Sequence, residues 1–468
     1  AAYLLLSDEE RALGHRLAAT WLEPRGEPPA LLAEHYERGE MLSHAARCWA
    51  RAAGQAFDAG SLDDVTRFGE HAIRCGVEGE ELGALSVVLA GARSYGQDDA
   101  GAATWAERAR RYLPVGEPAW WRATQLAAIA SLRLGAPELE ALIAQMVANY
   151  CDDLASPEQA MAVTYLLSEC LRLSRDDLAT RLLALLPAEL PRALRGRPEG
   201  CLAAARAIKA FQAGNLSDAL RFAEGALGAL RAAGSVRDVC ETLALSGHFL
   251  HELGAYQEAE SRLVEMVAIA ERIGSARDVC YGQLYLGAIH ARSGRLEEAE
   301  RVLQTAIAAC MRLGVSSFQA EARGHLAGVQ LARGALKDAR TSLECARLLE
   351  GVEPAAAAYL LARSAEVSRR EGSAQRALAE AGAAHALLSE HGVQEYVVIV
   401  ELSYAEALRA VGQTREAQHV LDRASATLLL RAAEIGDAAL RSSFLDQVAE
   451  HAMLRRLAAA GTGHTNKG

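Results

Sequence analysis

His251 and Glu252 begin the clearest chemistry-bearing pattern in the chain, because they match the start of the zinc motif HExxH. In that motif two histidines on one helical face hold the metal, and the glutamate acts as a general base. Position 255 is alanine, so the second histidine ligand is missing. His248 lies one turn before His251, and such a pair either binds a metal or packs inside a helical hairpin. We favour packing, and we predict no metal site and no catalytic residue.

Phosphate-binding patterns are also missing from the sequence. A P-loop needs GxxxxGK[ST], in which backbone amides and a lysine neutralise the phosphates. The three lysines, Lys209, Lys337 and Lys467, do not follow a glycine. The glycine-rich tail at 461–468 has no strand before it and no helix after it, and the chain contains no GxSxG nucleophile elbow. The sequence therefore predicts no cofactor.

The net charge and the cysteine pattern limit which partners and which cellular compartment can be expected for this chain. The formal net charge is −11, from 60 acidic and 49 basic residues, and this balance argues against a nucleic-acid partner. The nine cysteines are odd in number and contain no CxxC pair, as expected of small buried side chains in a reducing cytoplasm. No window has the roughly 18 apolar residues that a membrane helix needs. We expect a cytoplasmic chain that does not bind membranes.

The elements that position these residues follow from a repeat. The chain has 468 residues, 51% hydrophobic and only 5% aromatic, and its excess of alanine and leucine favours helices. A glycine followed five residues later by alanine recurs six times, at spacings of 40, 40, 40, 38 and 40 residues. These glycines are Gly214, Gly254, Gly294, Gly334, Gly372 and Gly412, and looser copies begin at Gly60, Gly96, Gly135 and Ser174. The period of about 39 residues is typical of a solenoid.

Small residues occupy matching positions around each glycine. Seven residues before it stand Ala207, Gly247, Gly287, Ala327, Ala365 and Ala405, and twelve after it stand Ala226, Met266, Ala306, Ala346, Ala384 and Ala424. Small side chains let two helices approach closely, while Leu263, Leu303, Leu343 and Leu421 fill the space between them. The predicted fold is all-α, a helix-hairpin solenoid of about ten antiparallel helix pairs.

These positions resemble the tetratricopeptide repeat, although the period is nearer 40 than 34 residues. The two ends of the chain resemble a more specific group of repeat proteins. Residues 6–15 (LSDEERALGH), 32–39 (LAEHYERG) and 46–53 (ARCWARAA) are similar to the junction after the ATPase module in large bacterial proteins that join a serine/threonine kinase, an AAA-type ATPase and repeats. Residues 444–454 (FLDQVAEHAML) are similar to the terminal helix of that group of signal-transducing (STAND-type) ATPases. The resemblance implies that kinase or ATPase modules precede this chain.

Five segments are expected along the chain. They are junction helices at 1–58, degenerate repeats at 59–198, regular repeats at 199–432, a capping helix at 433–460 and a disordered tail at 461–468. An irregular joint is expected near the prolines between 187 and 198.

One face of the regular repeats could bind a partner. The first helix of each pair lines the concave surface of a tetratricopeptide array, and positions 13, 10, 6 and 3 before each glycine share one helical side. This inner-face stripe contains Ile208, Phe211, His248, His251, Tyr281, Leu284, Leu331, Tyr359, Glu366, Arg369, Leu402, Glu406 and Arg409, together with Cys201 and Ile399. Apolar and aromatic residues bordered by charges suit a groove for a peptide or partner helix. If the superhelix is tightly wound, the same residues pack across the groove instead.

Three functions follow from these observations. The first is a non-catalytic protein-interaction and sensor arm of a multidomain signalling ATPase or kinase, which binds a partner or its own upstream modules. The second is a free-standing adaptor or scaffold protein. The third is an enzyme, which the missing site chemistry disfavours.

These 468 residues should neither bind nor hydrolyse ATP, because they lack a P-loop and a lysine placed to neutralise phosphates. Isothermal titration calorimetry with ATP and Mg²⁺ should give no binding heat. Micromolar ATP binding would contradict this expectation.

Overall fold

The computed structural model describes residues 6–150, 156–173, 175–186, 191, 194–392 and 394–462. Within these ranges the chain forms 24 α-helices and no strand, which confirms the all-α prediction. In the same residues no helix combines the length and the apolar character needed to cross a bilayer.

The chain divides into two compact units. Unit 1 runs to Ala205 and includes Arg272–Ser275, and unit 2 comprises Arg206–Glu271 and the chain from Ala276 onward. Helices in the first part of the chain are α1 (Asp8–Leu22), α2 (Pro29–Arg38), α3 (Leu42–Ala59), α4 (Leu62–Arg74), α5 (Gly79–Tyr95), α6 (Asp99–Tyr112), α7 (Pro118–Leu134), α8 (Leu139–Asn149), α9 (Pro157–Arg172), α10 (Asp176–Leu183) and α11 (Arg197–Gln212). The helices that follow are α12 (Leu216–Ala232), α13 (Val236–Glu252), α14 (Tyr256–Arg272), α15 (Ala276–Arg292), α16 (Leu296–Leu313), α17 (Ser316–Ala332), α18 (Leu336–Arg347), α19 (Pro354–Arg370), α20 (Ala374–His391), α21 (Val397–Ala410), α22 (Thr414–Ala433), α23 (Ala438–Asp446) and α24 (Ala449–Thr462).

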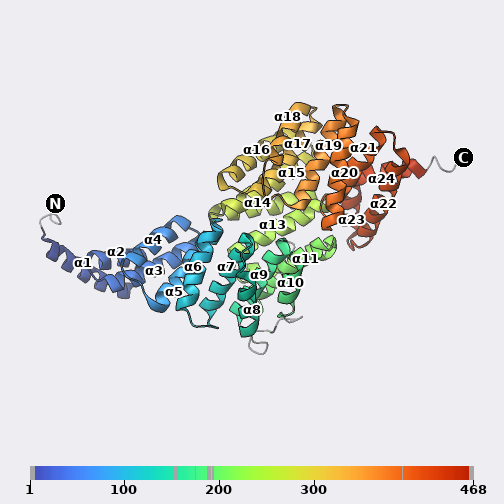
Figure 1. Cartoon of the computed structure of the whole chain (residues 1–468). Helices are drawn as coiled ribbons and strands as arrows, with labels where there is room; N and C mark the ends of the chain where they lie inside the picture. Colours follow the sequence, from blue (N-terminus) through green and yellow to red (C-terminus); the bar gives the residue numbers. More distant parts are fainter. Residues whose placement is uncertain are drawn as a thin grey trace. The chain divides into compact units, whose positions relative to one another are not determined.

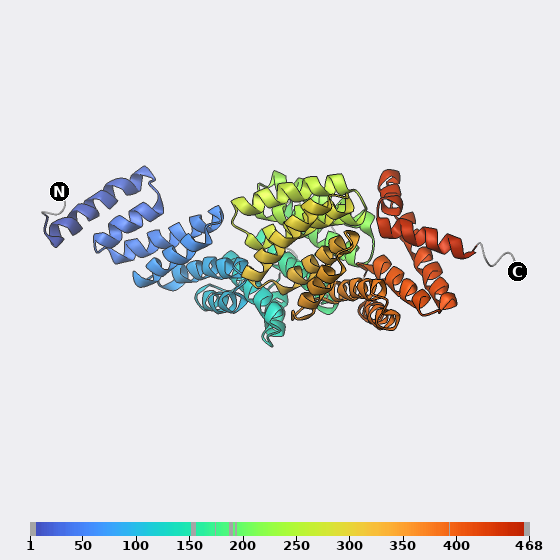
Figure 2. The same ribbon diagram turned by 90° about the horizontal axis from the view of Figure 1, so that it is seen from above.

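Helices that follow one another along the chain pack side by side within each unit (Figure 1, Figure 2). In unit 2 the pairs α15–α16, α17–α18, α19–α20 and α21–α22 form hairpins. The first helices of successive pairs also contact each other. These contacts are α13 with α15, α15 with α17, α17 with α19, and α19 with α21. This arrangement is the predicted tetratricopeptide-like solenoid, with the first helices forming one continuous layer.

The repeat glycines turn the chain between helices. Gly214, Gly254, Gly294, Gly334, Gly372 and Gly412 all have φ between 75° and 86°, a conformation that residues with a Cβ rarely adopt. Of the looser copies, Gly60 and Gly135 also have positive φ, whereas at Gly96 the neighbouring Gln97 takes the left-handed conformation, and Ser174 lies outside the described residues.

The small residues around each turn lie at the contact between the paired helices. A Cβ added to Gly247 would lie 2.8 Å from Leu263, and one added to Gly287 would lie 2.6 Å from Leu303. The predicted alanines five residues after each glycine are fully buried. The sequence prediction of close approach with leucine filling the space is therefore confirmed.

The C-terminal end differs from the prediction. The predicted single capping helix at 433–460 is two helices, α23 and α24, separated at Gln447 and Val448. Val448 is buried beside the α13–α14 turn, and a Cβ on Gly254 would lie 2.7 Å from the Ser443 carbonyl oxygen and 3.1 Å from Val448. The break at Gln447 and Val448 therefore lets both α23 and α24 pack against the end of the layer of repeat helices. Residues 461 and 462 belong to α24, whereas 463–468 lie outside the described residues. Residues 187–190, 192 and 193 of the predicted joint at 187–198 also lie outside them.

We predict that Gly287→Ala lowers the free energy of unfolding by about 1–3 kcal/mol, because its methyl group would overlap Leu303. Gly225→Ala in α12 is the matched control, because nothing lies within 4 Å of the added Cβ. That control should be stabilised by about 0.5–1 kcal/mol through helix propensity. Urea unfolding followed by circular dichroism measures both, and equal effects of the two substitutions would be inconsistent with close packing at Gly287.

Candidate functional site

Most of the inner-face stripe is buried in unit 2. Ile208, His248, His251, Leu284, Leu331, Tyr359 and Leu402 are buried, as are Cys201 and, in part, Ile399. Phe211, Tyr281, Glu366, Arg369, Glu406 and Arg409 are half-buried. Most apolar members of the stripe therefore pack in the interior. Replacing Tyr359, which is 1% exposed, by alanine should lower the free energy of unfolding by about 3–5 kcal/mol.

The two ends of unit 2 share an apolar core that includes the stripe residue Leu402. Leu216 in α12 and Leu253 after α13 pack in one apolar cluster with Leu402 in α21, Phe444 in α23 and Leu454 in α24. The superhelix therefore brings its first and last repeats together, and the C-terminal helix pair lies against the layer of first helices. Of the two outcomes left open by the sequence, packing across the groove is the one observed for these residues.

Stacked aromatic and imidazole rings connect neighbouring first helices. The rings of Tyr359 in α19 and Tyr396, which precedes α21, stack with centroids 4.4 Å apart. The Tyr359 hydroxyl lies 3.3 Å from His325 Nδ1 in α17, and the His325 ring is 6.5 Å from that of Tyr285 in α15. His248 in α13 continues the series with a centroid distance of 4.6 Å to Tyr285.

Glu321 is a carboxylate within this ring series, with 13% of its side chain exposed. The hydroxyls of Tyr285 (2.9 Å) and Tyr396 donate hydrogen bonds to it, and Glu395 lies close enough to repel its charge. Burial and this repulsion outweigh the hydrogen bonds and raise the pKa of Glu321 to about 7. Glu395 itself accepts from His248 Nε2 at 3.1 Å, a contact that outweighs the effect of burial and raises the pKa of His248.

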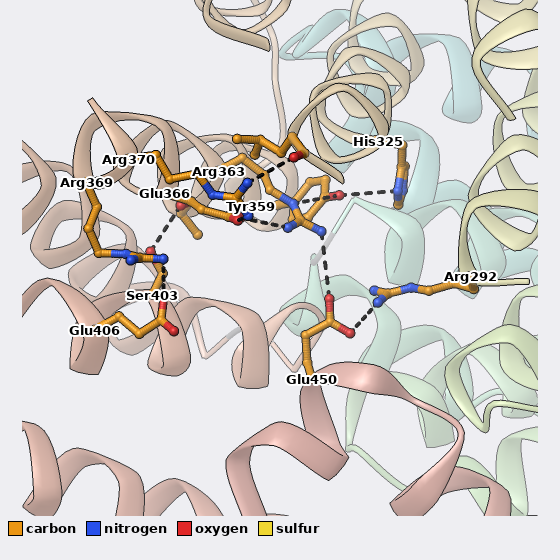
Figure 3. A network of polar contacts seen from close by, with 12 residues as sticks. Arg292, His325, Tyr359, Arg363, Glu366, Arg369, Arg370, Ser403, Glu406 and Glu450 are labelled. Carbon is orange, nitrogen blue, oxygen red and sulfur yellow. Dashed lines mark hydrogen bonds and ion pairs between the residues drawn. The ribbon is translucent and has the colours of Figure 1, made fainter. Parts of the chain in front are cut away.

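An ion cluster joins three helices from separate parts of unit 2 (Figure 3). Glu450 in the first turn of α24 accepts from Arg292 at the end of α15 and lies 3.7 Å from Arg363 in α19. Arg363 also donates to Glu366 at 3.1 Å and to the Tyr359 hydroxyl at 3.3 Å. Burial alone would raise the pKa of Glu450, but the two arginine charges outweigh it and lower that pKa to about 2.

A second, more exposed group of charges lies beside this cluster (Figure 3). Arg370 donates to Glu366 at 2.6 Å and to the Leu331 carbonyl oxygen at 2.9 Å. Arg369 pairs with Glu406 at 2.9 Å, with 34% and 26% of the two side chains exposed. The predicted stripe residues Glu366, Arg369 and Glu406 are thus brought together on α19 and α21.

A cavity of about 50 Å³ with charged and apolar lining residues lies where α13, α15, α17, α21 and the C-terminal pair meet. Its lining includes His251, Glu252, Arg292, His325 and Glu450. The volume holds several water molecules, and the charged lining favours polar contents over a dry cavity. Within the described chain, neither ring nitrogen of His251 has a hydrogen-bond partner, although Nδ1 lies 3.4 Å from a Glu252 oxygen.

His248 and His251 have different neighbours. His248 is engaged by Glu395 and by the Tyr281 hydroxyl, 3.1 Å from each, while His251 lies beside Glu252. Across the described part of the chain, no group of three or more metal-ligating side chains comes together.

Several residues of the site were missed by the sequence stripe. Positions nine and two before each glycine lie on the same helical side as positions thirteen and six. The position nine residues before the glycine supplies Tyr285, His325 and Arg363. The position two residues before it supplies Glu252 and Arg292. A stripe counted at 13, 9, 6 and 2 would have found these residues. Tyr396 lies in the connection before α21 and Glu450 lies beyond the last repeat, and neither carries a periodic signal.

The sequence matches no family model and no curated relative. Among solved structures, a Rap protein complexed with competence and sporulation factor is similar over 74% of this chain and 99% of that chain, with a TM-score of 0.52 and 13% identity. This similarity supports the helical-repeat fold.

Two further solved structures resemble the chain more weakly. The Rap conjugation gene regulator of plasmid pLS20 in complex with the Phr* peptide covers 81% of this chain and 98% of that one at 12% identity and a TM-score of 0.43. The match to the APC/C hetero-tetramer Cut9-Hcn1 covers 96% of this chain and 93% of that chain, at 14% identity and a TM-score of 0.40. Scores below 0.5 add nothing to the fold assignment.

We predict that Glu321 makes stability fall as pH rises. Its pKa rises from 4.5 in the unfolded chain to about 7 in the folded one, so the stability that its protonated form contributes is fully present below pH 4.5 and is lost as pH approaches 7. Glu321→Gln cannot ionise and should lack this loss. The free energy of unfolding of the variant relative to wild type should therefore increase by up to about 3 kcal/mol between pH 4.5 and 8.

Urea unfolding at several pH values measures this difference, with the exposed Glu416→Gln as the control. A difference between Glu321→Gln and wild type that stays constant across this pH range would show that Glu321 ionises normally in the folded protein.

Proposed function

We propose that this chain is a non-enzymatic binding scaffold that takes a protein or peptide partner on the inner face of unit 2. The observation that carries the proposal is the concentration of charged and aromatic groups on α13, α15, α17, α19 and α21. Charges in a protein interior cost free energy unless they are paired, and a core built only for stability uses apolar residues instead. Such groups gather at binding sites, where they recognise polar features of a partner.

The partly exposed members of the inner face are the proposed entry points. Tyr281, Arg369 and Arg409 retain access to solvent while the apolar stripe residues between them are buried. An aromatic ring and arginines are the side chains that most often anchor an interface. The Rap protein of similar fold is itself described in complex with competence and sporulation factor, which supports a partner-binding role for this architecture.

The larger context of this binding is also a proposal. The resemblance of residues 6–53 and 444–454 to parts of kinase–ATPase–repeat proteins favours a sensor arm whose partner biases a switch in signalling modules elsewhere in a longer protein. The alternative is a free-standing adaptor. Sequencing the coding region upstream of Ala1 distinguishes the two, because an upstream kinase or P-loop supports the sensor arm and a start codon at this point supports the adaptor.

We predict that peptides selected from a random library on the full chain bind through the inner face. Substituting Arg369 and Arg409 together by glutamine should weaken binding of the recovered peptides at least ten-fold, because both arginines border the buried stripe. Fluorescence anisotropy with labelled peptides measures the dissociation constants.

Arg376→Gln is the matched control, because Arg376 is an exposed arginine on α20, the second helix of its pair, and forms one ion pair with Glu380. It should leave peptide binding unchanged. Failure to recover any peptide, or equal binding by the double variant and the wild type, would contradict a partner site on the inner face.

A further inference from the structure

The C-terminal helix pair occupies part of the inner face. The main packing of α24 is against α21, α22 and α23, while Glu450 contacts Arg292 of α15 and Arg363 of α19. The exposed fractions of these three side chains are only 15–24%. A single carboxylate of α24 is thus placed between arginines of two different repeats (Figure 3).

Arg292 depends on this carboxylate more than Arg363 does. Arg363 has a second acidic partner in Glu366 on its own helix, 3.1 Å away. For Arg292, Glu450 is the one carboxylate partner found among the described residues. Removing one member of a buried ion pair leaves the other charge uncompensated, so the inner face needs an anionic group at this place.

The segment that carries Glu450 has the pattern of a groove-binding helix. Leu454 and Leu457, four and seven residues after Glu450, pack in the apolar cluster shared with α12, α21 and α22. A carboxylate in the first turn of a helix is also stabilised by the helix dipole. The segment follows Gly436, an exposed glycine with no atom within 4 Å of an added Cβ. At this glycine the connection to α22 is not packed against other residues.

We infer that α23–α24 is a built-in occupant of the partner site, and that the partner is an acidic helical segment whose carboxylate replaces Glu450 between Arg292 and Arg363. This inference rests on the proposed function and specifies its partner. The complementarity is of charge and of apolar packing, since two arginines meet one carboxylate and the leucines one and two turns further along the helix pack in the apolar cluster. A partner helix of this kind must displace α24 to bind.

The test uses the full chain and a labelled synthetic peptide that copies residues 437–460. The variant Glu450→Gln weakens the internal helix without changing the arginines. It should bind the peptide at least ten-fold more tightly than wild type does, because the added peptide no longer competes with an equivalent internal carboxylate. The peptide that itself carries E450Q should bind at least ten-fold more weakly, and Glu416→Gln in the chain should behave as wild type.

A second variant keeps the test decisive if Glu450→Gln does not fold. Leu454→Ala also weakens docking of α24, but it leaves Glu450 in place, and circular dichroism and thermal melting establish which variant is folded. Absence of peptide binding to a folded variant of either kind would overturn the inference, as would equal binding of the two peptides. If the inference fails but library peptides still bind through Arg369 and Arg409, the proposed function stands. If no library peptide binds but the 437–460 peptide does, the proposed function is refuted, and docking of the 437–460 peptide is a separate result.

Discussion

The ion cluster of Glu450 with Arg292 and Arg363 is the interaction on which the packed interior of unit 2 depends. It joins the C-terminal helix to two repeats that the chain visits much earlier, and leaving one of these charges unpaired would cost about 3–5 kcal/mol. Apolar packing of Phe444 and Leu454 surrounds the cluster but specifies no charge. The cluster therefore determines both where α24 lies and what kind of group can take its place.

The repeat geometry explains why these charges meet. Glycine or alanine seven residues before each turn lets the paired helices approach closely, and this approach holds the first helices in one continuous layer. Within that layer, side chains nine and two positions before each glycine project toward a common interior. Tyr285, His325 and Arg363 occupy the first of these positions in three successive repeats. Copying a structural unit has thus placed different side chains at equivalent points of one surface.

The sequence was sufficient to predict the local fold but not the interior. The glycine turns, the small contact residues and the leucines between helices follow from steric rules that act within one hairpin, and the structure agrees with them. The burial of Tyr359 and Leu284 could not be decided from the sequence, because it depends on how tightly successive pairs wind and on what fills the groove. The roles of Tyr396 and Glu450 could not be predicted, since Tyr396 lies in a connection between helices, Glu450 lies beyond the last repeat, and both contact residues far away in sequence.

The inner face therefore combines rigid repeats with a C-terminal segment that satisfies their charges. Amide hydrogen exchange of the full chain tests this account most directly, because it reports the opening free energy of each helix separately. The account predicts that amides of α24 exchange by a local opening, at least ten-fold faster than the slowest amides of α15 and α19, and that Glu450→Gln widens this gap. Exchange of α24 at the same rate as α15 and α19, by global unfolding alone, would show that α24 is a permanent part of the core.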